Sequence, residues 1–378
     1  MTQPKKNNFI YTIGKINFFT ALFFTLFLIK SILYIFEKDA LLGIINLGGD
    51  SDYYNDFALG LDVPASSIWP TILRKLNDAE LYNRNIISCL LFYIESLIIP
   101  FLFASLLPKP TSKNTIKQYK TVYWQIATTI EAYPSIFFYS LDIYRDTIMI
   151  LLTGITLHIV KTIIKQSFLK KIPLFFIFLS ISYLTYLFRP YLGFSLATAI
   201  LFLKIRVDKK NPIYITTIYL ITITLLKSIG AIDELLSYRE SDVFIDAGSS
   251  LGINLTQTSP ASFIALYIYS ALLQFFGLYI ISIKALIVFI TESAAIIFLT
   301  IYTIKNRKHL TPFLTYLTIF SIFYGTIWII ANDNLGTAVR LRTYNYLCII
   351  LIAASIYLEK FYISTEKKRL NFDCMLNR

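Results

Sequence analysis

Acidic and aromatic residues gather in one short stretch of an otherwise apolar sequence. Within GGDSDYYNDFALG, residues 48–60, Asp50 and Asp52 stand beside Tyr53 and Tyr54. An aspartate here is able to accept a proton from a sugar hydroxyl, and tyrosine rings stack on sugar rings. The two acids are therefore candidate catalytic residues, and the two tyrosines are candidate substrate-binding residues. Two alternatives stay open: two of the aspartates hold a divalent cation against a phosphate, or the segment is a solvated loop in which Asp and Gly only form turns.

A second polar group lies in YPSIFFYSLDIYRD, where acids and an arginine follow an apolar run interrupted by proline. The spacing of three and four residues predicts that Asp142 lies beside Arg145 and Asp146 on one face of a helix. Asp146 is a third candidate catalytic acid, and Arg145 is a candidate ligand for a substrate phosphate. The alternative is an interfacial helix cap with a weak ion pair.

Three arginines interrupt apolar segments. Arg189 lies in LFRPYLG, and Arg340 and Arg342 lie in GTAVRLR. An arginine within a membrane is costly and usually faces a polar cavity, and its planar fork holds phosphate oxygens in pairs. We therefore expect the three to form one substrate-binding site for diphosphate. The alternative is contact with anionic lipid headgroups.

The composition indicates that these residues belong to an integral membrane protein. Of 378 residues, 56% are hydrophobic and 15% are charged, and the mean hydropathy is +0.61. Apolar runs of membrane-spanning length alternate with charged loops, which predicts an all-α polytopic helical bundle that forms one domain over residues 1–378. Three glutamates within the runs are expected to pair with membrane arginines or Lys284: Glu95, Glu131 and Glu292. About ten membrane helices are expected, near residues 17–36, 86–107, 121–140, 147–164, 172–188, 191–205, 212–228, 283–303, 311–331 and 343–358.

The charge distribution predicts how the bundle is oriented. Lys and Arg gather in short loops that would face the cytoplasm, as the positive-inside rule expects. Both termini are then cytoplasmic, and residues 37–84 and 229–260 form two larger periplasmic loops. Residues 261–281 are long enough to cross, but a crossing would reverse the side of the basic loop KNRKH, so an interfacial or re-entrant helix is expected. The acidic segment 233–246 is expected to be a solvated amphipathic helix.

Several function classes are disfavoured by the motifs that the sequence lacks. It contains no Walker A motif, no GxGxxG after a strand, no HExxH and no CxxC, so neither a cofactor nor a metal ion is expected. The net charge of +12 lies in short clusters between apolar runs instead of forming one basic face. No nucleic-acid partner is therefore expected.

In layout the segments resemble the polytopic enzymes of bacterial surface-polysaccharide synthesis, the Wzy-type O-antigen or capsule polymerases. More loosely, they resemble the GT-C glycosyltransferases that use polyprenyl-linked donors. The resemblance rests on GGDSDYYNDFA in the first outer loop, PSIFFYS followed by YRD, the RPY turn, and GTAVRLR before the final helix. One departure is that Wzy-type enzymes commonly have arginine-rich outer loops, whereas residues 229–260 contain a single arginine, Arg239.

The resemblance implies polymerisation of lipid-linked oligosaccharide repeat units on the periplasmic face of the bacterial inner membrane, with undecaprenyl diphosphate as the leaving group. The implied partners are the undecaprenyl-diphosphate-linked glycan, membrane lipids and a chain-length regulator. Arginines would stabilise the leaving diphosphate, and acids would orient the acceptor hydroxyl. Arg74 and Arg84 are expected to be loop surface. Two alternatives stay open: GT-C-like transfer of one sugar from a polyprenyl-phosphate donor, and a flippase or exporter of lipid-linked oligosaccharide.

Overall fold

The protein is built from helices joined by short loops. The computed structural model describes residues 17–38, 49–61, 65, 67–110, 112–204, 211–240, 249–256 and 258–376. These residues contain no strand, and Ser250 and Asn334 form one isolated antiparallel bridge. The expectation of an all-α fold is confirmed. In chain order the helices are α1 (Phe18–Lys38), α2 (Gly49–Leu59), α3 (Ile68–Asp78), α4 (Arg84–Tyr93), η1 (Ile94–Ile98), α5 (Ile99–Ala104), α6 (Lys113–Glu131), α7 (Pro134–Phe138), α8 (Asp146–Lys165), α9 (Phe168–Phe188), α10 (Pro190–Ala199), η2 (Ile200–Phe202), α11 (Pro212–Ser228), α12 (Asp233–Arg239), α14 (Pro260–Phe275), α15 (Ile283–Val288), η3 (Phe289–Ser293), α16 (Ala294–Lys305), η4 (Arg307–His309), α17 (Pro312–Ala331) and α18 (Leu335–Leu376).

Seven helical segments in the described part of the chain are long and apolar enough to cross a membrane. This supports the expectation of a multi-pass membrane protein. α11 and α12 together make an eighth span only if the 85° bend between them is counted within one crossing. The expected number of about ten spans is therefore not confirmed. The seven segments are Phe18–Lys38, Arg84–Ala104, Asp146–Lys165, Phe168–Phe188, Ala285–Lys305, Pro312–Ala331 and Leu335–Lys367.

Two of the expected spans differ from the prediction for local reasons. α6 begins earlier than expected, so its first turns include Lys113, Lys117 and Lys120, which lower its hydropathy. It ends at Glu131, because Pro134 begins the separate helix α7 and its ring cannot donate the N–H that a continuing helix would need. α10 and η2 together cover 190–202, which is shorter than the ~20 residues of a full crossing.

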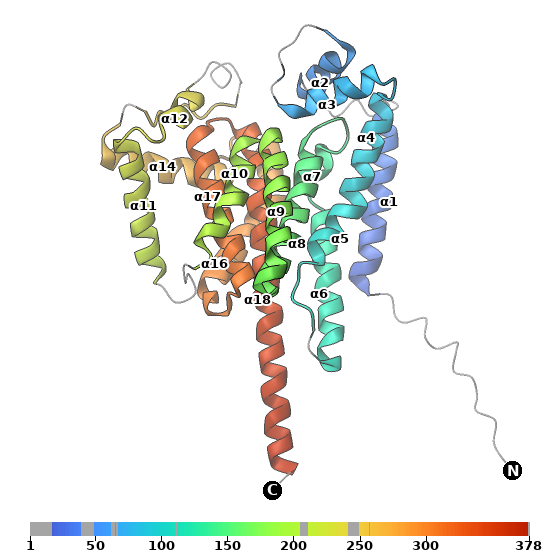
Figure 1. Ribbon diagram of the computed structural model, residues 1–378, viewed down its shortest axis with the longest axis vertical. Helices are drawn as coiled ribbons and strands as arrows, with labels where there is room; N and C mark the ends of the chain where they lie inside the picture. Colours follow the sequence, from blue (N-terminus) through green and yellow to red (C-terminus); the bar gives the residue numbers. More distant parts are fainter. Residues whose placement is uncertain are drawn as a thin grey trace, which may run out of the picture.

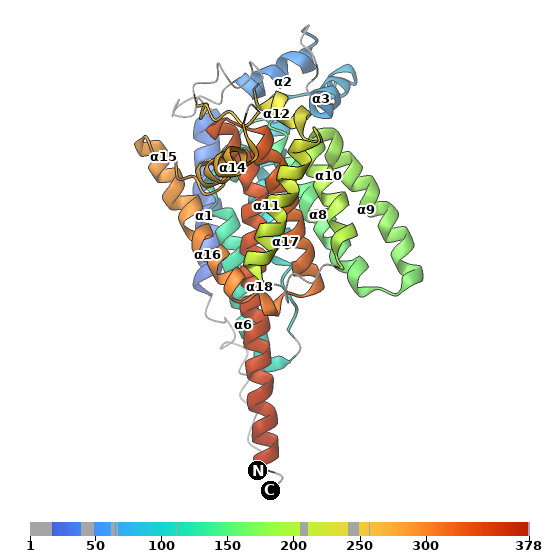
Figure 2. The ribbon, with the colours of Figure 1, turned by 90° about the vertical axis from the view of Figure 1, so that its left-hand side faces the viewer.

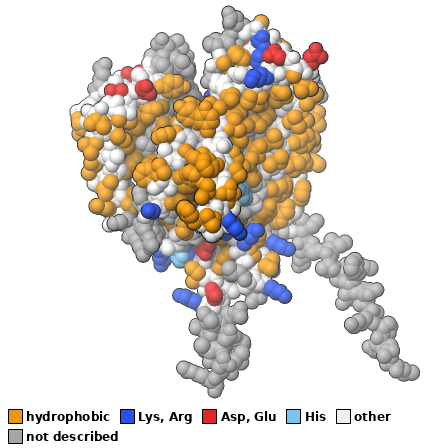
Figure 3. Space-filling model, in the orientation of Figure 1, with side chains coloured by type: hydrophobic (Ala, Val, Ile, Leu, Met, Phe, Trp, Pro, Cys, Tyr) orange, Lys and Arg blue, Asp and Glu red, His pale blue; other side chains and the backbone are white. Residues whose placement is uncertain are grey.

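Large apolar side chains are exposed around the middle of the molecule. Phe176, Leu201 and Phe298 are 65%, 71% and 73% exposed, and each lies on a different helical segment. Figure 3 shows this apolar belt, with Lys, Arg, Asp and Glu side chains near its upper and lower edges. So large an apolar surface is stable only when lipid or protein covers it.

The two ends of the molecule carry different elements. α1 begins and α18 ends at the same end, which we call the inner end (Figure 1). α2, α3 and α12 lie at the opposite end, which we call the outer end. The two segments expected as larger outer loops, 37–84 and 229–260, therefore contribute helices to one common end. Of these segments, residues 39–48, 62–64, 66, 241–248 and 257 lie outside the described residues.

The apolar segment 261–281 does not form a long helix along the bundle. Its helical part, α14, runs across the long axis of the molecule in Figure 1 and is seen along its own axis in Figure 2. It is also shorter than the seven candidate spans. This arrangement is the one expected of an interfacial or re-entrant helix. As a result, α11 and α16 run in opposite directions between the two ends.

The first outer segment folds into a packed layer of two helices. Tyr54 and Ala58 of α2 and Leu73 of α3 are buried in the core that extends into the helical bundle. The indole N–H of Trp69 donates to the backbone carbonyl oxygen of Ile143 at 2.7 Å. α2 and α3 are thereby fixed to the turn that carries the second polar group.

A tight hairpin joins α9 and α10. A side chain at Gly193 would overlap the backbone of Ser182 and Tyr186, so glycine permits the two helices to approach this closely. Arg189 lies at the corner, as the last residue before α10, with an extended backbone. The hairpin thus holds this arginine at the outer end.

We predict that the two ends lie on opposite sides of the membrane. In a cysteine-free background, Asp78→Cys at the outer end and Lys308→Cys at the inner end place exposed thiols on α3 and η4. An impermeant maleimide applied to spheroplasts should label Asp78→Cys directly and Lys308→Cys only after permeabilisation. Labelling of both in intact spheroplasts would overturn this topology.

Candidate functional site

A group of arginines and carboxylates from four elements meets at the outer end. The side chain of Arg340, on α18, forms ion pairs with Asp50 on α2 and with Asp146 on α8, the latter at 2.6 Å. Arg189 approaches the other oxygen of Asp146 at 3.6 Å. We call these four residues the outer arginine cluster. It unites residues from both polar stretches and from two of the arginine motifs predicted from the sequence.

The cluster is graded from buried to exposed. The side chains of Asp146 and Arg189 are 3% and 5% exposed, that of Arg340 is 14% exposed, and that of Asp50 is 51% exposed. The guanidinium of Arg340 also lies over the rings of Tyr139 and Tyr144, at 4.9 Å and 5.8 Å. Asp146 is therefore a buried anchor, whereas Asp50 is open to molecules at the outer face.

Several N–H groups of the cluster have no hydrogen-bond partner. These are Nε and Nη1 of Arg189 and Nε of Arg340, and the neighbouring Arg145 also leaves Nε without one. One acceptor of the cluster, Oδ1 of Asp146, has no hydrogen-bond partner either. A buried N–H of a charged group without an acceptor costs more than the 1–3 kcal/mol typical of neutral groups. The arginines also outnumber the acids, since Arg145, Arg189 and Arg340 face Asp50 and Asp146. The arrangement is suited to a bound anion.

Arg145 lies at the edge of this cluster. Its Nη1 donates to the backbone carbonyl oxygen of Phe188 at 3.0 Å, next to Arg189. The expectation that Asp142, Arg145 and Asp146 share one helical face is wrong, because α8 begins only at Asp146 and the preceding residues form turns. The turn separates Asp142 from Arg145 and Asp146.

Asp142 belongs to a different ion pair. Arg84 donates to both of its carboxylate oxygens, at 3.0 Å and 2.6 Å, and also to Asp52 at 2.8 Å. Arg84 is therefore not the plain loop surface that we expected. Asp52 is exposed and lies at the outer edge of this pair, apart from the contacts of the outer arginine cluster.

Arg342 is not brought into contact with the other two arginines. It pairs with Glu292 at 3.3 Å and lies over the ring of Tyr346. Two residues apart on a helix correspond to a rotation of about 200°, so Arg340 and Arg342 point to opposite faces of α18. The structure thus brings together two of the three arginines predicted for one site.

The tyrosines of the first segment pack instead of projecting outward. Tyr54 is 2% exposed, and its ring lies 5.3 Å from that of Tyr53, which is partly buried against the core. Burial raises the pKa of the Tyr54 hydroxyl above its usual value. The aromatic rings found beside Arg340 are instead Tyr139 and Tyr144, which the sequence analysis did not single out, although both lie within the quoted YPSIFFYSLDIYRD stretch.

The second outer segment contains a buried ion pair. Arg239 is 2% exposed, pairs with Asp333 and donates to the backbone carbonyl oxygen of Ile253 at 2.9 Å. Asp333 also accepts hydrogen bonds from Ser250 and from the backbone N–H of Gly252. The expectation of a solvated amphipathic helix is met in part by α12, where Asp233, Glu234 and Ser237 are exposed and Leu236 is buried, but Arg239 is buried as well. Residues 241–246 of the expected helix lie outside the described residues. The buried ion pair was not expected for α12. Its arginine connects the segment to the turn between α17 and α18.

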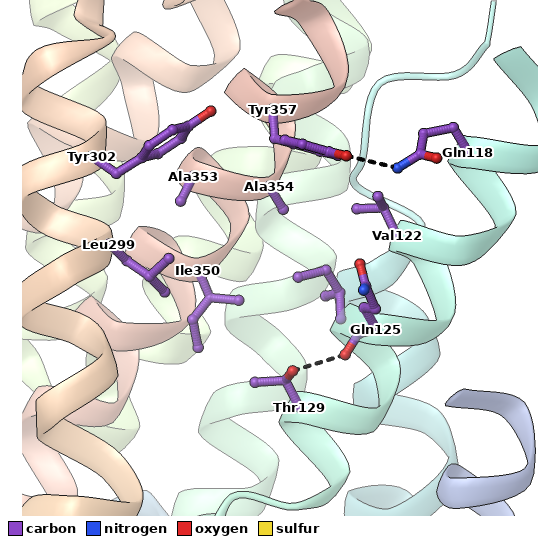
Figure 4. Close-up of a pocket in the computed structure, with 11 residues that line it drawn as sticks. Gln118, Val122, Gln125, Thr129, Leu299, Tyr302, Ile350, Ala353, Ala354 and Tyr357 are labelled. Atoms are coloured by element: carbon purple, nitrogen blue, oxygen red, sulfur yellow. Dashed lines mark hydrogen bonds between the residues drawn. The ribbon is translucent and has the colours of Figure 1, made fainter. Parts of the chain in front are cut away.

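An apolar groove runs from the inner half of the bundle toward the outer end. Figure 4 shows its inner part, a cavity of about 480 Å³ between α6, α16 and α18. An adjoining cavity of about 300 Å³ shares Gln125, Thr129, Leu299 and Ile350 with it and continues to Glu292. Glu292 pairs with Arg342, so the groove ends on the Arg342 side of α18, the face opposite the one that carries Arg340.

The described residues contain no cluster of three or more His, Cys, Asp or Glu side chains that could hold a metal ion. At the outer end, Arg340 pairs with the two carboxylates of Asp50 and Asp146, and Arg84 pairs with those of Asp52 and Asp142.

We predict that the Arg84–Asp142 pair stabilises the outer layer. Arg84→Ala leaves a carboxylate that is only 3% exposed without its main partner, and should lower the free energy of unfolding by about 3 kcal/mol. Arg74→Ala is the control, because Arg74 and its partner Asp78 are both exposed, and should change it by about 0.5 kcal/mol or less. Thermal unfolding in detergent measures both. Equal effects would contradict the prediction.

The same pair should make stability depend on pH. Burial would raise the pKa of Asp142, but the Arg84 hydrogen bonds and the Lys38 charge outweigh it and hold the pKa below its usual value. The contribution is therefore complete above the ordinary Asp pKa of about 4 and is lost as pH falls through the lowered folded value. Asp142→Asn should remove this part of the acid sensitivity, as measured by unfolding across acidic pH.

Comparison with known proteins yields no relative for this chain. No protein-family model, no curated protein and no solved structure matches it. The function is therefore inferred from the geometry of the outer arginine cluster and from the groove.

Proposed function

We propose that this protein is a membrane glycosyltransferase that polymerises lipid-linked oligosaccharide repeat units at the outer face of a bacterial inner membrane. The observation that carries the proposal is the outer arginine cluster. In it, the buried Arg189 and the partly buried Arg340 have unpartnered N–H groups, and Arg340 lies beside the exposed carboxylate of Asp50. A diphosphate supplies acceptor oxygens for these N–H groups, and a sugar hydroxyl is a suitable partner for the carboxylate.

The reaction requires two things of the protein. The oxygen of an acceptor hydroxyl forms a bond with the anomeric carbon of the donor sugar, while the bond from that carbon to the diphosphate oxygen breaks. Arg189 and Arg340 would stabilise the charge that develops on the departing diphosphate. Asp50 would orient the hydroxyl and accept its proton, because it is the exposed acid of the cluster.

Asp146 has a positioning role in this proposal. It is buried and touches both arginines, so it has no free face for the acceptor. Its carboxylate fixes the distance between the two guanidinium groups. Preorganised charge of this kind needs little rearrangement as the leaving group departs.

The groove supplies a place for the lipid part of the substrate. Its walls are mainly apolar, and its outer end is lined by Glu292, whose partner Arg342 lies on the outer half of α18. A polyprenyl chain lying there would bring its diphosphate toward the outer half of α18. The expected partners are thus an undecaprenyl-diphosphate-linked glycan, membrane lipids and a chain-length regulator.

A second candidate function is export or flipping of lipid-linked oligosaccharide. It is favoured by one observation, the charged side chains buried near the middle of the spans, among them Lys30 and Glu95. Transfer of a single sugar from a polyprenyl-phosphate donor would use the outer arginine cluster in the same way as polymerisation. The products in a deletion strain separate these functions.

We predict that the cluster arginines carry the activity. Arg189→Ala and Arg340→Ala should each lower the rate tenfold to a hundredfold, corresponding to the roughly 1.5 to 3 kcal/mol of one charge-assisted contact. Arg340→Lys should recover only part of the activity, because lysine keeps the charge but lacks the planar fork. Polymer length on gels, at equal membrane levels of each variant, is the measurement.

The control for this experiment is Arg74→Ala, which removes an exposed arginine at the same end of the molecule. It should leave the polymer ladder unchanged. Full-length ladders from the Arg189→Ala and Arg340→Ala strains would contradict the proposed site.

Deletion of the gene should leave single repeat units on their lipid carrier at the outer face. Polymerisation is then the only missing step, so units are made and moved outward but not joined. A glycan lacking one sugar in every unit would support the single-sugar transferase. Units that stay on the cytoplasmic side would support the flippase.

A further inference from the structure

A lysine and two glutamates that do not belong to the outer arginine cluster meet in the interior of the bundle. Lys30 of α1 lies 2.6 Å from Glu95 of η1 and 3.5 Å from Glu131 at the end of α6. The side chain of Lys30 is 8% exposed, and those of both glutamates are 0% exposed. We call these three residues the interior triad.

Lys30 and Glu95 lie near the middle of the spans that carry them, and Glu131, the last residue of α6, lies beside Lys30. At 1.5 Å per residue, Lys30 is about 18 Å from the first residue of α1, and Glu95 is about 16 Å from Arg84, where the span of α4, η1 and α5 begins. Ionisable groups at such a depth are expensive and usually functional. A position near mid-span places the triad away from the headgroups and water that would otherwise solvate it.

The charges of the triad do not balance if all three groups are ionised. One ammonium faces two carboxylates, and the pair of Lys30 with Glu95 is already complete. Glu95 also accepts a hydrogen bond from Ser96 at 2.7 Å. By contrast, neither carboxylate oxygen of Glu131 has a hydrogen-bond partner. A buried carboxylate in this state is neutralised most simply by a proton.

The surroundings do not supply a second cation for Glu131. On the α7 side, the ring of Phe137 lies 5.0 Å from the Lys30 ammonium. On the α18 side, Arg342 already pairs with Glu292, and Tyr133 donates to that same glutamate at 3.3 Å. The charged groups that face Glu131 are thus Lys30 from α1 and Glu95 from η1.

We propose that Glu131 is a proton-binding site within the membrane, held beside a permanent Lys30–Glu95 ion pair. Uptake converts its carboxylate and one proton from water into a carboxylic acid, and release reverses this, with no change in oxidation state. Sugar transfer at the outer end needs no proton at this depth. The site therefore points to a step of the protein, such as a conformational change, that responds to proton concentration.

Infrared spectroscopy of the full-length protein in lipid nanodiscs tests this proposal. The wild type at neutral pH should show the carbonyl stretch of a buried protonated carboxylic acid, which shifts in D₂O and is lost on alkaline titration. Glu131→Gln should abolish the band while keeping a neutral side chain of the same shape. Glu366→Gln is the matched control, since Glu366 is an exposed residue of α18, and should leave the band unchanged.

The infrared result does not depend on enzymatic activity. The proton-site proposal can therefore be wrong while the proposed function is right, and the proposed function can be wrong while the proton site is right. Absence of the band in the wild type, or its survival in Glu131→Gln, would overturn the proposal. Glu95→Gln gives an independent check. It leaves Glu131 as the partner of Lys30, so the acid should ionise and the band should again disappear.

Discussion

The arrangement of the outer end depends on one buried carboxylate, that of Asp146. It lies between the guanidinium groups of Arg340 and Arg189, and so connects the beginnings of α8 and α18 with the corner between α9 and α10. Because water is largely excluded, attraction between these charges is stronger than at a surface, and removal of one partner would leave the others unpaired. The free-energy cost of burying these charges is offset only when Asp146, Arg189 and Arg340 are all present.

The remaining outer elements are attached around this carboxylate. Asp50 forms an ion pair with Arg340 and so fixes α2, while the indole N–H of Trp69 on α3 donates to the turn that precedes α8. Arg84, the first residue of α4, forms an ion pair with Asp142 in the same turn. The outer layer is therefore a helical cap fixed by side chains from distant parts of the chain, and an exposed acid at its edge is held against a partly buried arginine.

The features that depend on local sequence were predictable. Apolar run length gave the all-helical membrane fold and most span positions, and charge bias favoured the transverse placement of α14. Pairing between distant segments was not predictable, because it depends on tertiary contact: Arg84 and Asp142 are 58 residues apart, and Arg239 and Asp333 are 94 apart. The separation of Arg340 from Arg342 is different, since helical geometry alone places residues two apart on opposite faces.

Two short π-helices carry buried glutamates, Glu95 in η1 and Glu292 in η3. A π turn accommodates an extra residue within an otherwise α-helical run, so the helix before it is rotated relative to the helix after it. Each span can then present different faces to its neighbours in its two halves. A deletion of one residue in either segment would leave the hydropathy profile almost unchanged. It would nevertheless restore the regular helix and turn the glutamate, or the half-helix beyond it, away from its partners.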